Sequence, residues 1–513
     1  MIRRIAMLSV VPLGLMACGS GGRTGASAAA PPTPASLIRA EDLRRDLFAF
    51  AADSFRGRET GTPDAQRAAA FLARRVLALG LEPAGDSMYV QRLPLLRESF
   101  APTTHVAVIE QGRTTTLQLG DEVVPVTSFG EGMPEPRRNG GGELVFAGYG
   151  TASDLAKVDI TGKAVVVLHG APPGSSPDAA RQLESQQALG ERLGRLLPMR
   201  PAAIVFLMTG GAVDFYWQLA PELLRGIVPA GHEEMDLDES RPLPMVVLGL
   251  ARVGSPLLPP SWPADARPQR LGRQFSGHIE LQRTPFTAYN VVAVVRGSDP
   301  ALNHSYVAFG AHYDHIGIVH GAGPDTIANG ADDDGSGSVS LLAIAHAMQS
   351  RPPRRSVLFV WHVGEEKGLL GSSYFTEHPT IPIDSIVAQL NADMIGRNAP
   401  SLLFIVGPRA APNGQSRVLG AIVDSVNAAQ PLPFAIDREW DDPNHPEHIY
   451  QRSDHYNYAK RGIPIVFFTT GLHADYHRPG DEAARIDYPK LTRVARLMLE
   501  TGAAVANRAT RPR

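Results

Sequence analysis

The stretch "SYVAFGAHYDH", from Ser305 to His315, is apolar over most of its length and then ends abruptly in histidine and aspartate. A short apolar run of this kind is typical of a strand that is buried on both faces of a sheet. Four more segments have the same character: "YNVVAVVRG", "RSVLFVWHV", "SIVAQLNAD" and "PIVFFTT". Most of them are followed by a polar loop and a helical pattern. The sequence therefore predicts an α/β fold in which a largely parallel mixed sheet is flanked by helices.

Histidines and carboxylates follow the ends of these predicted strands. In a parallel α/β sheet, the loops at the carboxyl ends of the strands gather on one side and form the active site. One such residue alone has an ordinary structural explanation, because paired glutamates at the start of a helix also suit its dipole. Their recurrence at successive strand ends predicts a metal site built from His312 and Asp314, Glu365 and Glu366, Asp393, and His477.

The segment "GADDDGSG", from Gly330 to Gly337, places three carboxylates side by side with no positive charge among them. Adjacent like charges repel, so such a cluster is retained either in water or around a cation. A solvated Asp/Gly turn is one interpretation. A calcium-binding EF-hand is disfavoured, because its loop needs acidic residues at alternate positions. The neighbouring strand ends favour a cation site that includes Asp333.

The ordered set "HYD", "DDDGSG", "GEE", "DMIG" and "YH" resembles metallopeptidase family 28, the co-catalytic di-zinc aminopeptidases. The resemblance covers about Phe286 to Leu499, and "SFRGRETGTP" also resembles the family's N-terminal segment. It implies a zinc-aminopeptidase-like fold that binds two zinc ions, which manganese or cobalt could replace. Within that pattern His312 and Asp393 are ligands of one half of the site, Glu366 and His477 serve the other half, and Asp333 bridges both.

The resemblance also implies roles for the residues beside the ligands. Neighbouring helical residues point about 100° apart, so Glu365 and Glu366 cannot face one ion in the same way. The family assigns Glu365 as the general base that takes a proton from the attacking water. Asp314 is expected to accept the second ring N–H of His312 and so fix its tautomer. Tyr476 is expected to donate a hydrogen bond to the oxyanion, although packing is the commoner role of a single tyrosine.

The N-terminus has the features of an export signal. Arg3 and Arg4 precede an apolar run that is too short to span a bilayer, so residues 1–17 are predicted to be a signal peptide. Cys18, the only cysteine of the chain, stands in a context that resembles the lipobox of bacterial lipoproteins. Residues 18–36 are rich in glycine, alanine, serine and proline, as in a flexible tether. We expect a chain anchored by lipid at the cell envelope, with the outer membrane as the favoured location.

The remainder divides into three predicted parts. Residues 37–141 form the N-terminal part of the peptidase domain with connecting strands, and residues 259–508 form its metal-binding part. Residues 142–258 contain "ELVFAGYG", "GKAVVVLHG" and "PMVVLGL" as short strands, and resemble a protease-associated domain inserted into the peptidase. That domain is expected to be small and β-rich, and an unrelated α/β insert is the alternative.

The function predicted from these features is that of a zinc-dependent exopeptidase that removes N-terminal residues from peptides. The net charge of −3 provides no basic surface for nucleic acid. The same metal scaffold also supports carboxypeptidases and glutaminyl cyclases, which remain alternatives. A receptor-like binding protein without catalysis is a further alternative, which the complete set of expected ligands disfavours.

Overall fold

The computed structural model describes residues 33–128, 135–224, 226–231, 243–319, 323–407, 417–442, 444–445 and 447–512. The predicted signal peptide, Cys18 and most of the tether lie outside these residues. Residues Pro34–Arg513 form one compact unit. Within the described ranges, none of the helices has the length and apolar character needed to cross a membrane.

The first of the two large sheets carries the predicted core strands. Its strands follow the order β19 (Ala435–Asp437), β18 (Leu402–Val406), β20 (Ile465–Thr469), β17 (Ile386–Ala392), β13 (Tyr306–His312), β16 (Ser356–His362), β12 (Leu281–Val295), β2 (Val90–Phe100) and β9 (Ile227–Pro229), and β1 (Glu82–Pro83) pairs with β12. The central strands β20, β17, β13 and β16 are parallel, and their carboxyl ends therefore meet at one edge. This confirms the predicted largely parallel mixed sheet.

One predicted core strand, β12, runs antiparallel to its neighbours β16 and β2. Only residues 296–305 connect β12 to β13. A parallel crossover needs a dozen or more residues, usually with a helix, so a link of this length reverses the chain direction instead. The apolar pattern predicted the strand correctly but did not predict its direction.

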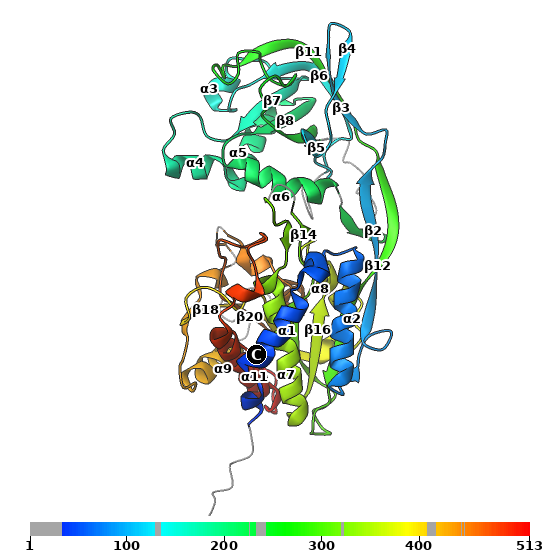
Figure 1. Ribbon diagram of the computed structural model, residues 1–513, viewed down its shortest axis with the longest axis vertical. Helices are drawn as coiled ribbons and strands as arrows, with labels where there is room; N and C mark the ends of the chain where they lie inside the picture. Colours follow the sequence, from blue (N-terminus) through cyan, green and yellow to red (C-terminus); the bar gives the residue numbers. More distant parts are fainter. Residues whose placement is uncertain are drawn as a thin grey trace, which may run out of the picture. The chain divides into compact units, whose positions relative to one another are not determined.

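Helices cover both faces of this sheet (Figure 1), which explains why the strands are apolar throughout. Along β12, Val291, Ala293 and Val295 belong to one core cluster, whereas Val292 and Val294 belong to another. The first face packs against α1 (Ala40–Phe50), α2 (Pro63–Ala78), α7 (Gly337–Ser350), α9 (Arg417–Ala428) and α11 (Tyr488–Ala506). The second packs against α8 (Leu370–Glu377) and α10 (His455–Lys460).

The second sheet is larger than the predicted insert. It follows the order β4 (Arg113–Thr116), β3 (His105–Glu110), β11 (Gln269–His278), β6 (Asn139–Phe146), β7 (Ala164–His169), β8 (Ala203–Met208), β10 (Met245–Leu250) and β5 (Val123–Pro125). Its helices are α3 (Ala152–Leu155), α4 (Pro177–Leu183), α5 (Gln186–Leu196) and α6 (Ala212–Leu224). The sheet therefore takes strands from both sides of residues 142–258. The reason is long-range pairing, because β11 joins β3 on one side and β6 on the other.

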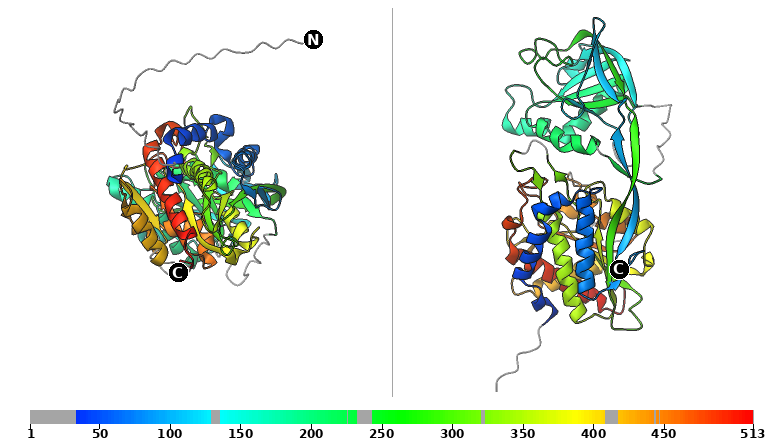
Figure 2. Two further views of the ribbon diagram at one scale, coloured as in Figure 1. Left: turned by 90° about the horizontal axis from the view of Figure 1, so that it is seen from below. Right: turned by 45° about the vertical axis from the view of Figure 1, so that its right-hand side comes forward.

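The long strands β2 and β12 connect the two sheets along the chain. They pair over the whole of β2, from Leu281 opposite Phe100 to Val291 opposite Val90, and Figure 2 shows them side by side. The chain passes from β2 directly to β3, and it returns from β11 directly to β12. The part of the chain that forms the second sheet is thus bounded by β2 and β12, which pair with each other.

The N-terminal segment is helical but interrupted. Between α1 and α2, residues of "SFRGRETGTP" form the short helix η2 (Asp53–Arg58) and a turn. Gly57 has a φ of +71°, and a Cβ atom there would lie 2.7 Å from the main-chain oxygen of Gly317. Gly317 belongs to a small two-stranded sheet of β14 (Gly317–Ile318) and β15 (Ile327–Ala328). The glycine allows the segment to approach the loops that follow β13.

Candidate metal centre

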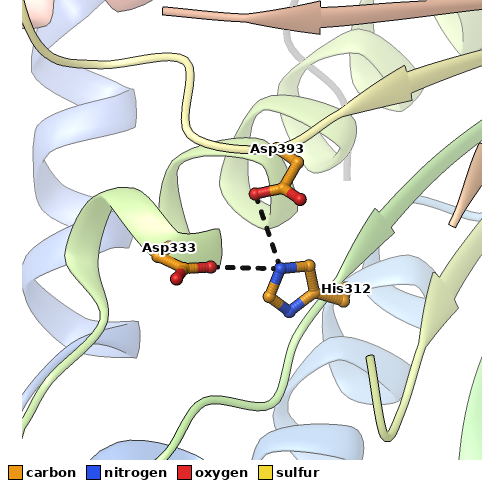
Figure 3. Close-up of side chains that lie close together, drawn as sticks. All are labelled: His312, Asp333 and Asp393. Atoms are coloured by element: carbon orange, nitrogen blue, oxygen red, sulfur yellow. Dashed lines mark ion pairs between the residues drawn. The ribbon is translucent and has the colours of Figure 1, made fainter. Parts of the chain in front are cut away.

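One half of the predicted metal site is assembled at the carboxyl edge of the first sheet. His312 is the last residue of β13, Asp393 follows β17, and Asp333 lies in the irregular turn η4 (Ala331–Ser336) that precedes α7. The Nε2 atom of His312 lies 3.2 Å from Oδ1 of Asp333 and 3.5 Å from Oδ1 of Asp393. Figure 3 shows the two carboxylates converging on this ring nitrogen.

The other half shares Asp333 with the first. The Nε2 atom of His477 lies 3.3 Å from Oδ2 of Asp333 and 3.0 Å from Oε2 of Glu366. Asp333 therefore turns one oxygen toward His312 and the other toward His477. This is the arrangement that a carboxylate bridging two ions requires, and the structure brings all five predicted ligands together.

The free atoms of the site fit divalent ions. Buried polar atoms are normally hydrogen-bonded, so each exception needs an explanation. Among the described residues, Nε2 of His312, Oδ1 of Asp393 and Nε2 of His477 are buried without a hydrogen-bond partner. All three atoms point into the two groups just described. Unprotonated imidazole nitrogens and carboxylate oxygens are the donors that zinc prefers, so the residues present fit this metal.

The charges of the site also indicate a need for cations. Burial raises the pKa of Glu365 well above its usual range, and the nearby carboxylates of Asp393 and Glu366 add to the effect. Burial alone would also raise the pKa of Glu366, but the imidazoles of His477 and His315 hold it at about 2. Several carboxylates are thus crowded in a buried space, where the positive groups nearby are imidazoles and the guanidinium groups of Arg58 and Arg452. Divalent ions would relieve this repulsion and leave the histidines neutral.

The other two aspartates of "GADDDGSG" shape the turn. Oδ1 of Asp332 accepts a hydrogen bond from the Gly396 main-chain N–H at 2.6 Å, and Oδ1 of Asp334 accepts one from the N–H of Gly337 at 2.8 Å. A further carboxylate, that of Asp481, accepts the main-chain N–H groups of Asp332 and Asp333 at 3.0 Å. These bonds orient Asp333. Asp481 was not predicted, although "DYHRPGD" ends on it.

The predicted role of Asp314 is wrong in one respect. The Nδ1 atom of His312 lies 3.1 Å from the main-chain oxygen of Asp314 but 3.9 Å from its carboxylate. The carboxylate instead accepts hydrogen bonds from Thr60 Oγ1 at 2.7 Å and from the N–H of Glu365 at 3.3 Å. The tautomer of His312 is therefore set by a main-chain carbonyl. The Asp314 side chain ties together two of the loops that carry the site.

Arg58 is a buried support that the sequence did not reveal. Its guanidinium donates hydrogen bonds to the main-chain oxygens of Tyr313 at 2.7 Å, Asn329 at 2.7 Å and Gly330 at 2.8 Å. These residues flank His312 and the turn that carries Asp333. The segment "SFRGRETGTP", which carries both Arg58 and Thr60, thus forms hydrogen bonds with the loops that carry the metal ligands. The resemblance of this segment to the family's N-terminal segment is the sequence signal that could have indicated that Arg58 supports the site.

A cleft opens beside the metal ligands. Its lining includes the side chains of Asp333, Asp393, Glu365 and Tyr476. The other lining residues are mostly apolar, with polar groups among them: Met394, Trp440, Ile449, Arg452, Ser453, Phe467, Thr469 and Leu472. The Tyr476 hydroxyl lies 3.3 Å from a guanidinium nitrogen of Arg452, which comes from the "RSDH" segment. The predicted base and the predicted oxyanion donor therefore face the same cleft.

His315 is a member of the site that the sequence analysis missed. Its Nδ1 atom lies 2.7 Å from Oε1 of Glu366 and 3.7 Å from Oδ2 of Asp333. The signal was present, because His315 is the second histidine of "HYDH" and follows the same strand end as His312.

Part of the chain matches the model of a known family. Residues 290–502 match Peptidase family M28. This M28 segment contains every predicted metal ligand, from His312 to His477. The motifs that we single out in the sequence and the family match therefore fall in the same stretch of the chain.

The chain is also similar to curated relatives over part of its length. The chain is 29% identical over 231 residues to a probable leucine aminopeptidase 2 of Aspergillus oryzae, which covers 41% of this chain and 43% of the relative. It is 29% identical over 248 residues to a probable leucine aminopeptidase of Trichophyton verrucosum, and this match covers 46% of this chain and 63% of the relative. The matched region thus spans less than half of the first relative's length.

Two solved structures share the fold over most of their length. An aminopeptidase from Aneurinibacillus sp. strain AM-1 aligns with a TM-score of 0.57 and 17% identity, covering 93% of this chain and 96% of that one. A zinc aminopeptidase from Bacillus subtilis aligns with a TM-score of 0.54 and 18% identity, and the alignment covers 90% of this chain and 94% of that one. The predicted zinc-aminopeptidase-like fold is confirmed.

Proposed function

We propose that this protein is a zinc-dependent aminopeptidase that binds two zinc ions and hydrolyses N-terminal residues from peptides. The observation that carries the proposal is the position of Asp333, whose two oxygens face His312 and His477 at the ends of different segments. The match to family M28 and the similarity to fungal proteins that are named leucine aminopeptidases support the same reaction.

The residues that would hold the ions are His312 and Asp393 in one half, Glu366 and His477 in the other, with Asp333 shared. Two ions at such a site supply a polarised scissile carbonyl and a water of lowered pKa. In this arrangement Glu365 takes the proton of that water and passes it to the departing amine. The hydroxyl of Tyr476 donates a hydrogen bond to the developing oxyanion, and Arg452 orients that hydroxyl.

The cleft favours a peptide whose first side chain is apolar. Trp440, Ile449 and Phe467 are among the residues that line it. A free α-amino group is a cation, and the carboxylates of Asp333, Asp393 and Glu365 line the same cleft. The proposal therefore favours cleavage at the amino end over cleavage at the carboxyl end.

Peptides with blocked ends test this assignment. One apolar peptide is prepared with a free or acetylated N-terminus and a free or amidated C-terminus, and each form is assayed with and without a chelator. We expect chelator-sensitive cleavage that requires only the free N-terminus, since acetylation removes the charge of the amine. Dependence on the free C-terminus would indicate a carboxypeptidase, and cyclisation of an N-terminal glutamine would indicate a glutaminyl cyclase. Absence of turnover by the zinc-loaded protein would favour a binding protein.

The setting of the enzyme is part of the proposal. We propose that the protein is a lipoprotein held at the cell envelope through Cys18, on the strength of the signal-like residues 1–17 and the lipobox-like sequence before Cys18. The second sheet is proposed to be a protease-associated module, because its parallel strands β6, β7, β8 and β10 include the segments that carry that resemblance.

A further inference from the structure

The charged lining of the cleft is acidic apart from one guanidinium group. Asp333, Glu365 and Asp393 contribute carboxylates, and Arg452 is the only basic side chain among the described residues that line the cleft. Zinc ions at the proposed site would offset the negative charge of the carboxylates. The positive charge of Arg452 is then the charge in the cleft that an anionic group of the substrate can approach.

The guanidinium of Arg452 is only weakly paired within the protein. Its closest carboxylate among the described residues is that of Glu447, which lies 3.9 Å from Nη1, and the two side chains are 39% and 57% exposed. Ion pairs that are this open to solvent contribute little free energy. The Nη2 atom donates a hydrogen bond to a neutral group, the hydroxyl of Tyr476, at 3.3 Å. A carboxylate could therefore bind Arg452 without displacing a strong partner.

The contact with Tyr476 limits how far this charge lies from the reacting carbonyl group. In the proposed reaction the Tyr476 hydroxyl donates a hydrogen bond, about 3 Å long, to the carbonyl oxygen. Arg452 is one further contact away, at 3.3 Å, so Nη2 lies within about 6 Å of that oxygen. The terminal carboxylate of a dipeptide lies one residue, at most about 3.6 Å, beyond the scissile carbonyl, and that of a tripeptide lies up to about 7 Å beyond it. The carboxylate of a dipeptide is therefore within reach of the guanidinium.

We propose that Arg452 binds the terminal carboxylate of a dipeptide, so that the enzyme prefers dipeptides with an apolar first residue to longer or amidated peptides. The inference rests on the proposed aminopeptidase function and names its substrate class. A guanidinium donates two parallel N–H groups to a carboxylate, and such charge-assisted pairs are stronger than hydrogen bonds between neutral groups. In a longer peptide, a neutral carbonyl group takes the place of the carboxylate.

Three substrates with the same first residue test this preference: leucyl-alanine, its C-terminal amide, and leucyl-alanyl-alanine. We expect kcat/KM of the wild-type enzyme to be at least about tenfold higher for the dipeptide than for either of the others. The difference should lie mainly in KM, because the carboxylate is bound equally before and during the reaction. The amide should still be cleaved, since the reaction itself requires only the free amine.

Substitutions separate this role from the contact with Tyr476. Arg452→Met should remove the preference for the dipeptide, whereas Arg452→Lys should retain part of it. Tyr476→Phe should lower kcat for all three substrates and leave their ratio unchanged. Arg461→Met is a matched control, because Arg461 also forms a long, exposed ion pair, 3.8 Å from Glu377, but does not line the cleft. Circular dichroism verifies that each variant is folded, and Arg452→Gln replaces Arg452→Met if it is not.

A second pair of substrates distinguishes the terminal carboxylate from an acidic side chain at the same residue. Leucyl-aspartic acid diamide and leucyl-asparaginamide should be cleaved with kcat/KM values within about threefold of each other. Equal kcat/KM for leucyl-alanine and its amide in the wild type, or a preference that survives in Arg452→Met, overturns the inference. A zinc-loaded protein that cleaves none of these peptides overturns the proposed function itself.

Discussion

Glu365 differs from Glu366 in what surrounds its carboxylate, although the two residues are adjacent. Glu366 lies between the imidazoles of His315 and His477. Glu365 lies in the cleft beside Asp393 and Tyr476, where burial and the neighbouring carboxylates raise its pKa. The different surroundings therefore suit Glu366 to bind a metal ion and Glu365 to exchange protons with a substrate.

Replacing Glu365 by Gln tests this separation. We expect turnover of an apolar aminoacyl substrate to fall by about 10² to 10⁴, because the amide cannot accept the proton of the attacking water. The zinc content should stay at the wild-type value, because Glu365 is not one of the proposed ligands. Steady-state kinetics and elemental analysis of the same preparation provide both measurements.

A matched variant is Glu377→Gln, which changes an exposed glutamate at the end of α8 and should leave turnover unaltered. If Glu365→Gln retained wild-type turnover, the role of base would have to be reassigned to another carboxylate of the cleft.

At the scale of elements, the metal centre depends on loops that one buried arginine joins. Arg58 follows α1 in the chain, yet it bonds to the main chain after β13 and to the turn before α7. Burial lowers its pKa to about 10, and the carboxylates of the site oppose this shift, so the side chain is still charged at neutral pH. The interaction ties the N-terminal segment to the edge of the sheet that carries the ligands.

Replacing Arg58 by Met should therefore destabilise the whole protein. The main-chain oxygens of Phe50, Tyr313 and Asn329 would lose the hydrogen bond from Arg58, whereas that of Gly330 still accepts one from the N–H of Gly335. Each unsatisfied carbonyl group costs about 1 kcal/mol or more, so we expect the free energy of unfolding to fall by about 3 kcal/mol. Urea denaturation followed by circular dichroism measures the change.

The control for this prediction is Arg67→Met, which removes an exposed arginine from α2 and should alter the free energy of unfolding by less than about 1 kcal/mol. Equal effects of the two substitutions would mean that the buried hydrogen bonds of Arg58 add nothing to stability.

At the scale of the whole molecule, membrane attachment is predicted to depend on Cys18. Residues 1–17 have the features of an export signal, and a lipobox-like sequence precedes Cys18. Stable anchoring of a bacterial lipoprotein comes from acyl chains in the bilayer, which the Cys18→Ser variant cannot acquire. We expect this variant to move from the membrane fraction to the soluble fraction, with unchanged activity per molecule.

Fractionation of cells, followed by immunoblotting and a peptidase assay, measures both properties. Ser20→Ala, which alters a nearby residue of the tether, serves as the control. Retention of the Cys18→Ser protein in the membrane fraction would contradict the lipobox assignment.

The sequence by itself determined the class of the fold and the ligands of the proposed site. Strands buried on both faces leave continuous apolar runs, and ligands at strand ends leave polar residues immediately after those runs, so both features are local and can be read directly. This is why β13, β16, β17 and β20 were predicted correctly.

Only the tertiary structure decided the features that depend on long-range pairing and packing. These features are the direction of β12, the pairing of β11 with β3 and β6, and the hydrogen bonds of Arg58. Each depends on contacts between residues that are far apart in the chain. The same holds for His315, whose neighbours Glu366 and His477 come from other loops. A sequence pattern shows which side chains could interact. Which of them lie close enough to do so depends on the folded sheet, because pairing of the strands brings their loops together.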